Sequence, residues 1–266
     1  MVVSVSHTFV VLAYKQSPYL ESCIQSVLRQ TSRSQVLIAT STPNDFIDAL
    51  ADTYDVKVKV NPKQGKGIGC DFDFAWQCAD SELVTIAHQD DIYDLFYGEK
   101  ILQAYRKHPD SIILFSDYYE IRNDRKVKTN LNLKIKRLLL APSRLDRLGH
   151  RTAIKRSSIC FGNAICCPAV TFAKNNISLD SIFTCDMKCN IDWQGWEKLS
   201  REKGRFTFVP DQLMGHRIYE QSTTSAIIAD NIRTQEDLQV YSKFWPAWIA
   251  KGITKIYRLS EKSNQL

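Results

Sequence analysis

The stretch LVTIAHQDD, residues 83–91, places a short uninterrupted apolar run directly before two adjacent carboxylates. Such a run, short and partly β-branched, is typical of a buried strand. Two neighbouring carboxylates at the mouth of a buried strand repel each other and lose hydration unless positive charge lies beside them. A divalent cation supplies that charge, and carboxylate oxygens suit Mg²⁺ or Mn²⁺. The stretch therefore predicts a metal site at Asp90 and Asp91. The alternative is that Asp91 is the N-cap of a helix that runs through Tyr93.

The same alternation of apolar runs and amphipathic stretches extends through the first half of the chain. Strands are predicted at 9–13, 36–39, 56–60, 83–87 and 112–115, and helices at 44–52, 72–79, 96–107 and after a Ser17–Pro18 start, with Ser17 as N-cap. Strand and helix alternating at these lengths predict an α/β fold with a mostly parallel sheet covered on both faces. Since such sheets bind ligands beyond the carboxyl ends of their strands, polar residues just after an apolar run are the candidate site residues.

The second half of the chain is less regular. Residues 161–174 form an apolar region punctuated by glycine and proline, and residues 192–203 predict a helix. The tail, 237–258, has a helical pattern interrupted at Pro246 and mixes aromatic residues with lysines. A helix of that composition either lies in a membrane interface or packs back on the domain, and both interpretations stay open.

The net charge of +6 is unevenly distributed along the chain. Residues 122–156, here called the basic block, hold twelve Lys and Arg against Asp124 and Asp146, a local charge of +10 that leaves −4 for the rest. Such a block indicates phosphates, anionic lipid or nucleic acid, or simply a solvated basic face. Because the block has no interleaved aromatic residues and no known nucleic-acid motif, we expect no nucleic-acid partner.

The eight cysteines lie mostly inside apolar runs, and no Cys-x-x-Cys pair occurs. We therefore expect reduced, mostly buried thiols in a reducing compartment. The first twelve residues lack the basic start and long apolar run of a signal peptide, and no window of about 18 apolar residues is present. These features predict a cytoplasmic protein, with peripheral contact at the inner face of the cell membrane as a further expectation.

Four segments, in order along the chain, resemble family 2 glycosyltransferases of the GT-A fold. They are 9–31 (FVVLAYKQSPYLESCIQSVLRQT), 69–91 with the approach to an Asp-x-Asp signature, 192–199 (DWQGWEKL) and 214–224 (MGHRIYEQSTT). The resemblance implies a Rossmann-like central sheet within a single domain. Its nucleotide-sugar-binding half is expected at 1–120, an acceptor-binding half with the catalytic base at 121–236, and an amphipathic helical tail at 237–266.

The resemblance also implies roles for individual residues. Asp192 matches the catalytic base, which takes the proton of the acceptor hydroxyl while that oxygen attacks the anomeric carbon and inverts it; capping its own helix is a compatible second role. The expected metal ligands are Asp90, Asp91, His88 and His216. The expected nucleotide-sugar contacts are Ala13, Tyr14, Lys15, Ser41, Lys66, Asp73, His88, Gln89, Asp90 and Arg217.

On the acceptor side the resemblance points to Asn163 and Trp193. Trp193 either stacks on a sugar ring or fills the core, and the same choice applies to Trp196 with the core favoured.

The sequence departs from the family pattern at four places. His88 stands where the first Asp of the signature is expected, and no acid follows the second strand, which runs into Thr40-Ser41-Thr42-Pro43. Phe72–Asp73 replaces an Arg-Asn pair, and Tyr219 replaces a closing His. The nucleotide subsite is therefore non-standard, with UDP as the default nucleotide.

These observations predict an inverting glycosyltransferase that uses Mn²⁺ or Mg²⁺. Its donor is a nucleotide-diphosphate sugar, and its acceptor is a hydroxyl of a glycan or a lipid-linked glycan in bacterial surface polysaccharide or glycolipid assembly. The missing acid after the second strand, His88 and Tyr219 motivate an alternative, a catalytically inactive nucleotide- or glycan-binding subunit of a glycosyltransferase complex. A Rossmann dehydrogenase is disfavoured because the glycines at 65, 67 and 69 have the wrong spacing.

Overall fold

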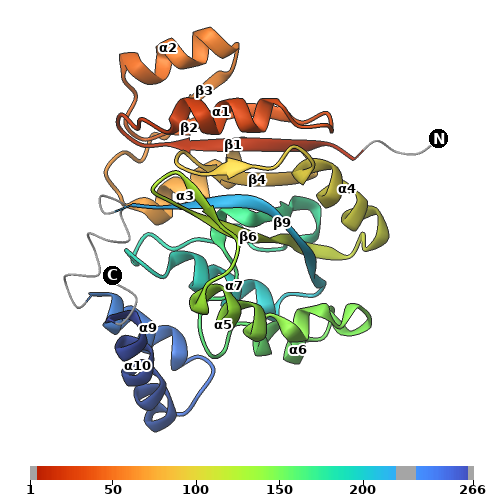
Figure 1. Ribbon diagram of the computed structural model, residues 1–266, viewed down its shortest axis with the longest axis vertical. Helices are drawn as coiled ribbons and strands as arrows, with labels where there is room; N and C mark the ends of the chain where they lie inside the picture. Colours follow the sequence, from red (N-terminus) through yellow and green to blue (C-terminus); the bar gives the residue numbers. More distant parts are fainter. Residues whose placement is uncertain (1–4, 220–231, 263–266) are drawn as a thin grey trace.

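The computed structural model describes residues 5–219 and 232–262 and shows a central sheet with helices on both faces (Figure 1). Its strands are β1 (His7–Ala13), β2 (Gln35–Thr40), β3 (Lys57–Val60), β4 (Leu83–His88), β5 (Ile92–Tyr93), β6 (Ser111–Arg122), β7 (Arg125–Val127), β8 (Val170–Ala173) and β9 (Arg205–Ile218). The strand order is β3-β2-β1-β4-β8-β6-β9-β5, and β7 pairs with β6. The predicted strands are all present, and 112–115 belongs to the longer β6.

Most of the paired residues belong to parallel pairings, which join β1 to β2 and β4, β2 to β3, and β6 to β9. Short antiparallel pairings attach β8 to β4 and β6, β5 to β9, and β7 to β6. The predicted α/β fold with a mostly parallel sheet is confirmed. Ala13 pairs with Thr40, and Leu12 pairs with His88. The carboxyl ends of β1, β2 and β4 therefore lie side by side along one edge of the sheet.

The helices are α1 (Leu20–Leu28), α2 (Asp45–Tyr54), α3 (Ile68–Cys78), α4 (Tyr97–Lys107), α5 (Leu131–Leu139), α6 (Thr152–Ser157), α7 (Ile191–Arg201), α9 (Ile232–Tyr241) and α10 (Ala247–Lys262). Asn44 caps α2, since its side-chain oxygen accepts from the N–H groups of Phe46 and Ile47. The predicted Ser17 cap of α1 is wrong, because the helix begins two residues later with Tyr19 as N-cap. Ser17 instead accepts from Tyr19 N at 3.3 Å, in the turn that precedes the helix.

Two apolar cores fill the space between the sheet and its helices. On one face α3 and α7 contribute Phe72, Trp76 and Trp196, and on the other α1 and α4 contribute Ile24 and Tyr97. β1 serves both cores, because side chains alternate along a strand. Its central residues are accordingly fully buried on both faces, which accounts for the continuous apolar run of β1 in the sequence.

The tail packs back on the domain. The helical pattern broken at Pro246 appears as α9 and α10, and the indole N–H of Trp245 donates to Cys160 O at 2.8 Å. The guanidinium of Arg156 lies 4.5 Å from the centre of the Phe244 ring. The expected boundaries at 120/121 and 236/237 fall inside β6 and α9, so these regions are continuous parts of the fold. The side chains of Ile256, Tyr257 and Arg258, and the Ser-Thr-Thr end of the fourth resembling segment, lie outside the described residues.

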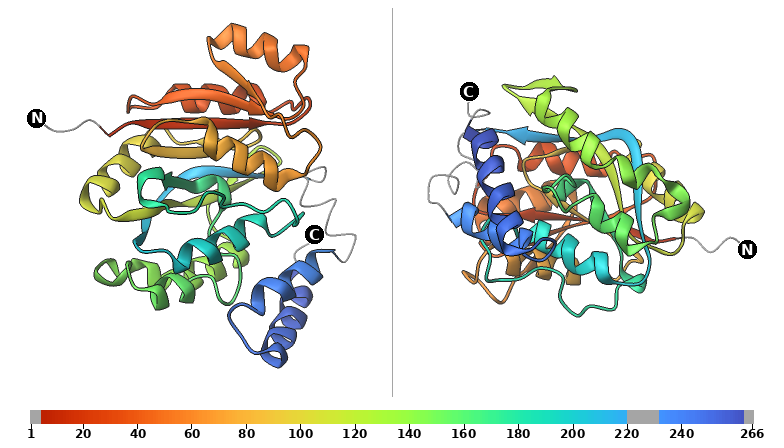
Figure 2. Two further views of the ribbon diagram at one scale, coloured as in Figure 1. Left: turned by 180° about the vertical axis from the view of Figure 1, so that it is seen from behind. Right: turned by 90° about the horizontal axis from the view of Figure 1, so that it is seen from below.

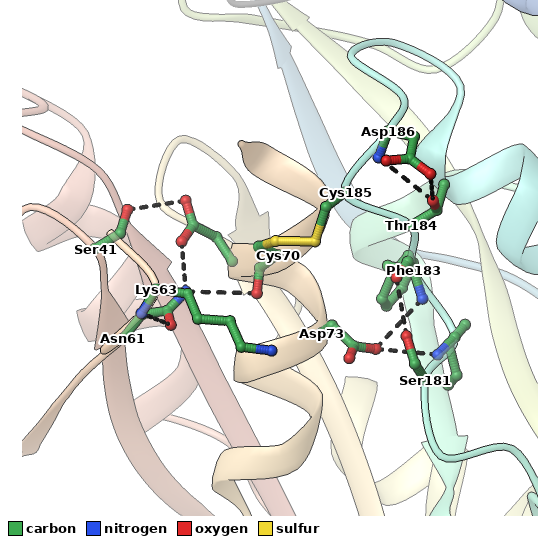
Figure 3. Close-up of a disulfide and its surroundings, with 12 residues drawn as sticks. Ser41, Asn61, Lys63, Cys70, Asp73, Ser181, Phe183, Thr184, Cys185 and Asp186 are labelled. Carbon is green, nitrogen blue, oxygen red and sulfur yellow. Dashed lines mark hydrogen bonds between the residues drawn. A yellow bond between two sulfur atoms is a disulfide. The ribbon is translucent and has the colours of Figure 1, made fainter. Parts of the chain in front are cut away.

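A disulfide joins Cys70 in the first turn of α3 to Cys185 in the loop before α7 (Figure 3). The expectation that all eight cysteines are reduced is therefore wrong for this pair. Their separation of 115 residues hides the contact in the sequence, and only the fold brings the two segments together. The segments pack closely, since a Cβ built at Gly69 would lie on the carbonyl oxygen of Thr184. The remaining cysteines are free and mostly buried, as expected.

Among the described residues, no helix combines the length and the apolar character needed to cross a bilayer.

Candidate functional site

The carboxyl ends of β1, β2 and β4 are tied together by hydrogen bonds of the residues that follow them. Tyr14 N donates to Gln89 Oε1 at 2.9 Å, and Gln89 Nε2 donates back to Tyr14 O at 3.2 Å. Lys15 N donates to Thr42 Oγ1 at 2.6 Å. The structure thus gathers most of the predicted nucleotide-sugar contacts at one edge of the sheet. They are Ala13, Tyr14, Lys15, Ser41, His88, Gln89 and Asp90.

Asp71 of α3 brings an acid to this edge that sequence reasoning missed. Ser41 Oγ donates to Asp71 Oδ2 at 2.9 Å, and Asn61 Nδ2 donates to Asp71 Oδ1 at 2.8 Å. An acid of α3 thus lies beside Ser41, although no acid directly follows the second strand in the sequence. Two aspartates two residues apart, at 71 and 73, are the signal in the sequence, and only Asp73 was predicted to contact the nucleotide.

Asp73 faces away from the strand ends. Its Oδ1 accepts from Ile182 N at 3.0 Å and from Phe183 N at 3.4 Å, beside the disulfide (Figure 3). Residues two apart on a helix point in different directions, so Asp71 and Asp73 cannot share one role. The prediction of Asp73 as a nucleotide contact is wrong in this structure. Lys66 lies exposed in the loop before α3, and its role stays a prediction.

Asp91 is fully buried and joins the end of β4 to β9. Its Oδ1 accepts from His216 Nδ1 at 3.0 Å and from Arg217 N at 2.9 Å. Although burial lowers the pKa of His216, the charges of Asp91 and Asp90 and the bond to Asp91 raise it overall. The alternative of Asp91 as a helix N-cap is wrong, because the next residues form β5. These hydrogen bonds fix Asp91 and, through the chain, the position of Asp90.

Asp90 is half-buried beside groups from β9. Burial and the charge of Asp91 raise its pKa. Arg217 Nε donates to the carbonyl oxygen of Asp90 at 3.1 Å, and its guanidinium lies 4.2 Å from the centre of the Tyr19 ring. Burial raises the pKa of Tyr219, and a hydrogen bond to Asp90 raises it further. Tyr219, in the place of the expected closing His, therefore contacts the same carboxylate.

His88, Asp90 and Asp91 form a group that fits a divalent cation. Each offers one ligand atom, and these atoms all lie within 4.8 Å of one another. Burial lowers the pKa of His88, which favours the neutral imidazole that ligates metals. Its Nε2 is buried without a hydrogen-bond partner among the described residues. Carboxylate oxygens and a neutral imidazole both ligate divalent cations, whereas His216 is bonded to Asp91 through Nδ1.

Asp192 lies in the first turn of α7 and is held from two directions. Asn163 Nδ2 donates to its Oδ2 at 2.7 Å, and Trp193 N donates to its Oδ1 at 2.8 Å. Burial raises the pKa of Asp192, against the lowering effect of the Asn163 hydrogen bond. The N-cap of α7 is Asn190, so the capping role suggested for Asp192 is wrong. Asn163 is thereby placed as the group that orients Asp192.

Asp91 and Asp192 both act on two buried thiols. Burial raises the pKa of Cys167, and the charges of Asp192 and Asp91 raise it further. The same two carboxylates raise the pKa of Cys166, where burial is again the largest cause. The segment from Asn163 to Pro168 contacts both surroundings, since Asn163 bonds to Asp192 and the hydroxyl of Tyr93, two residues after Asp91, donates to Pro168 O.

Trp193 does not offer a ring face to a sugar. Its side chain is 1% exposed, its indole N–H donates to Ile159 O at 2.9 Å, and its ring stands edge-to-face against Tyr241 at 4.8 Å between centroids. The sugar-stacking role predicted for it is therefore wrong in this structure, because α7 turns this side chain into the core. Trp196 is also fully buried, as expected.

Glu236 of α9 is a second residue that sequence reasoning missed. Its carboxylate accepts from the N–H groups of Lys188, Cys189 and Asn190, at 2.7, 2.8 and 2.9 Å. Asp237 accepts from Asn190 Nδ2 at 2.7 Å. These bonds hold the chain that leads into α7, and with it Asp192. No motif marks Glu236, which is 46 residues away from Asn190.

Comparisons with known proteins were made with the whole chain. The model of the family described as glycosyl transferase family 2 matches residues 8–162. No curated protein matches the chain.

Several solved structures share the fold. The chain is similar to Staphylococcus aureus TarS, residues 1–349, at 13% identity and a TM-score of 0.62, covering 94% of this chain and 69% of that one. The complex of the same protein with UDP-GlcNAc gives 14% identity and a TM-score of 0.63, covering 94% and 70%. The mannosyltransferase PcManGT from Pyrobaculum calidifontis, in complex with GDP-Man and Mn²⁺, gives 13% identity and a TM-score of 0.61, covering 93% and 69%.

Proposed function

The chain belongs to glycosyl transferase family 2, and we propose that it is an inverting enzyme in which Asp192 is the base and the group at residues 88–91 holds the leaving diphosphate. The observation that supports this proposal is that the segment from Asn163 to Pro168 contacts both sites: Asn163 bonds to Asp192, and Tyr93, two residues after Asp91, donates to Pro168 O. A base and a leaving-group site on opposite sides of one reaction centre are what a single displacement requires.

The donor is a nucleotide-diphosphate sugar, with UDP as the default nucleotide. Solved structures of the same fold hold UDP-GlcNAc and GDP-Man, which supports a nucleotide sugar at the corresponding edge of this sheet. Asp71 of α3 and Asn61, which follows β3, carry oxygens that can accept from the N–H edge of a base. Lys15 and Arg217 supply positive charge toward the phosphates.

His88, Asp90 and Asp91 would hold the divalent cation, Mn²⁺ or Mg²⁺. Such an ion, when bound, neutralises the charge that develops on the departing diphosphate. Asp91 contributes through position, because its hydrogen bonds to His216 and Arg217 keep the end of β4 fixed against β9. The carboxylate of Asp90 and Nε2 of His88, which has no hydrogen-bond partner among the described residues, are the groups that can still bind the cation.

Asp192 accepts the proton of the acceptor hydroxyl. That oxygen forms the new bond to the anomeric carbon while the bond from this carbon to the diphosphate oxygen breaks, so the anomeric centre inverts. The raised pKa of Asp192 makes its carboxylate a stronger proton acceptor than an exposed aspartate. Asn163 keeps one carboxylate oxygen oriented during this step. The acceptor is proposed to be a glycan or lipid-linked glycan of a bacterial surface polysaccharide or glycolipid.

Thermal unfolding with UDP- and GDP-sugars, with and without Mn²⁺, tests the donor site. A bound ligand raises the melting temperature by mass action. We expect a nucleotide sugar with Mn²⁺ to stabilise the wild type, and Asp90→Asn to lose the metal-dependent part of the shift, about tenfold or more in apparent affinity. Asp52→Asn, on the exposed face of α2, is the matched control and should behave as wild type.

Equal metal-dependent shifts in Asp90→Asn and wild type would exclude the metal role of residue 90. Tight nucleotide binding that needs no metal, together with no transfer to any acceptor, would instead favour a non-catalytic binding subunit.

A further inference from the structure

Helix α5 exposes a stripe of aliphatic side chains to solvent. Leu131, Ile135 and Leu138 are 70%, 45% and 73% exposed. Their spacing of four and three residues places them on one face of the helix. Leu133, on the opposite face, is buried in the core. When the inner face of a helix already packs on the core, an apolar stripe on its outer face indicates a second surface on which that stripe is buried.

The surroundings of this stripe are strongly basic. Lys134 on the helix itself and Lys128 just before it are exposed, and so are Arg125 and Lys126 of β7. Both acids of the basic block are paired with cations elsewhere, Asp124 with Arg217, and Asp146 with Lys107 and His108. Within 5–219 and 232–262, no carboxylate forms an ion pair with the four exposed cations.

The inner face of α5 bonds to β6, where the ring of Tyr118 stands edge-to-face against His216 of the candidate site, with 6.2 Å between ring centroids. Lys136 Nζ donates to Tyr118 Oη at 2.9 Å, and Arg137 Nε donates to Asp117 Oδ2 at 2.8 Å. The charge of Lys136 acts on Asp192, whose pKa it lowers against the larger effect of burial. Figure 2 shows α5 beside α6 and toward the end of the molecule that carries α9 and α10, far from α2 (Figure 2). A surface docked on the outer face of α5 therefore lies next to the acceptor side of the site.

We propose that the exposed face of α5 docks on an anionic lipid bilayer, with Leu131, Ile135 and Leu138 entering the interface and the surrounding cations facing the headgroups. Three exposed aliphatic side chains, with Lys134 on the same helix and Lys128 just before it, match a bilayer, which offers apolar depth and a negative surface together. The stripe is small for a stable protein interface, which buries about 800 Å² on each partner. On the proposed function, this places Asp192 beside the membrane and selects a lipid-linked acceptor.

The tail is a weaker docking candidate than α5. Trp248 is 76% exposed, but Ala250 and Thr254 of the same helix are buried against the domain. Phe244 and Trp245 also pack on the core. Among the described side chains of α10, Trp248 is thus the one large apolar residue that is exposed, together with Lys251 and Lys255.

Flotation of the full chain with lipid vesicles tests the docking surface. The vesicles are made of phosphatidylcholine alone, or of equal parts phosphatidylcholine and phosphatidylglycerol. We expect binding to the anionic vesicles, at least about tenfold above that to the neutral ones and reduced by added salt. Leu131→Asn with Leu138→Asn should weaken this binding about tenfold or more, since the change removes apolar depth and no charge.

Matched controls identify the face that binds. Leu95→Asn with Phe96→Asn removes another half-exposed apolar pair, and Trp248→Asn removes the exposed residue of the tail; both should leave vesicle binding unchanged. No binding to anionic vesicles, or equal binding by the α5 variant and wild type, would overturn the proposal. Loss of vesicle binding in Trp248→Asn would also overturn it, because that result would assign docking to the tail. A third contrary result would be that the α5 variant binds vesicles normally but fails to form a complex with another protein.

The donor site is measured on the same variants, so the two proposals fail separately. The α5 variant should keep the Mn²⁺-dependent thermal shift with nucleotide sugar. A wild type that shows the nucleotide shift but does not bind anionic vesicles disproves docking alone, whereas a wild type that binds vesicles but no nucleotide disproves the proposed function alone.

Discussion

The donor side and the acceptor side of the site are built in different ways. On the donor side, Tyr14, Lys15 and Gln89 follow three adjacent parallel strands and bond to one another at the strand ends. On the acceptor side, Asp192 depends on Asn163, and the chain leading to it depends on Glu236. The register of a parallel sheet is enough to place the first group. The second is placed by contacts between segments far apart in the sequence.

Nucleotide binding and catalysis therefore depend on different parts of the molecule. A change on the acceptor side should impair transfer while nucleotide binding persists, because the strand ends do not rely on α7 for their register. The Cys70–Cys185 disulfide is the exception, since it joins α3 of the donor side to the loop before α7 (Figure 3). The following changes test this separation.

Asp192→Asn has the largest expected effect. An amide accepts no proton at neutral pH, so transfer should fall by about 10²- to 10⁴-fold, the usual contribution of a general base. The loss should appear in kcat, with the metal-dependent thermal shift by nucleotide sugar unchanged. Steady-state kinetics with a soluble acceptor measures it. Asp180→Asn, an exposed change in the loop before α7, serves as control, and a parallel loss of nucleotide binding in Asp192→Asn would contradict the separation.

Removal of the disulfide is the next largest change. Cys70→Ser with Cys185→Ser should lower the free energy of unfolding by about 2–4 kcal/mol, because the bond closes a long loop in the unfolded chain. Urea unfolding of wild type, with and without reductant, measures the effect. The double variant should match reduced wild type and should not respond to reductant itself. A wild-type stability that is insensitive to reductant would show that the pair does not hold the two sides together.

Glu236→Gln has the smallest expected effect. The amide keeps one acceptor oxygen but turns an NH₂ group toward a backbone N–H, so hydrogen bonds to a charged group worth about 1.5–3 kcal/mol are weakened. We expect lower stability and a modest fall in kcat, with nucleotide affinity retained. Glu21→Gln, an exposed glutamate of α1 that bonds to Tyr54, is the matched control. A fall in nucleotide affinity larger than the fall in kcat would break the comparison.

The fold and the donor side were largely predictable. Uninterrupted apolar runs predict buried strands, and parallel strands bring their ends together without further information. The choice between Asp71 and Asp73 was not predictable in the same way. Both lie two residues apart on α3, and only the direction of the helix relative to β2 decides that Asp71 meets Ser41 while Asp73 meets residues 182 and 183.

The order of the strands in the sheet was set by the tertiary structure, but the buried apolar runs and the adjacent carboxylates at the end of β4 were determined by the sequence alone. The tertiary structure decided which groups surround them. It buried Trp193 against Tyr241, paired Cys70 with Cys185, and set the carboxylate of Glu236 on the chain before Asp192. The physical reason is that a periodic pattern specifies which face of an element is buried, whereas the partner on that face is specified only when distant segments pack together.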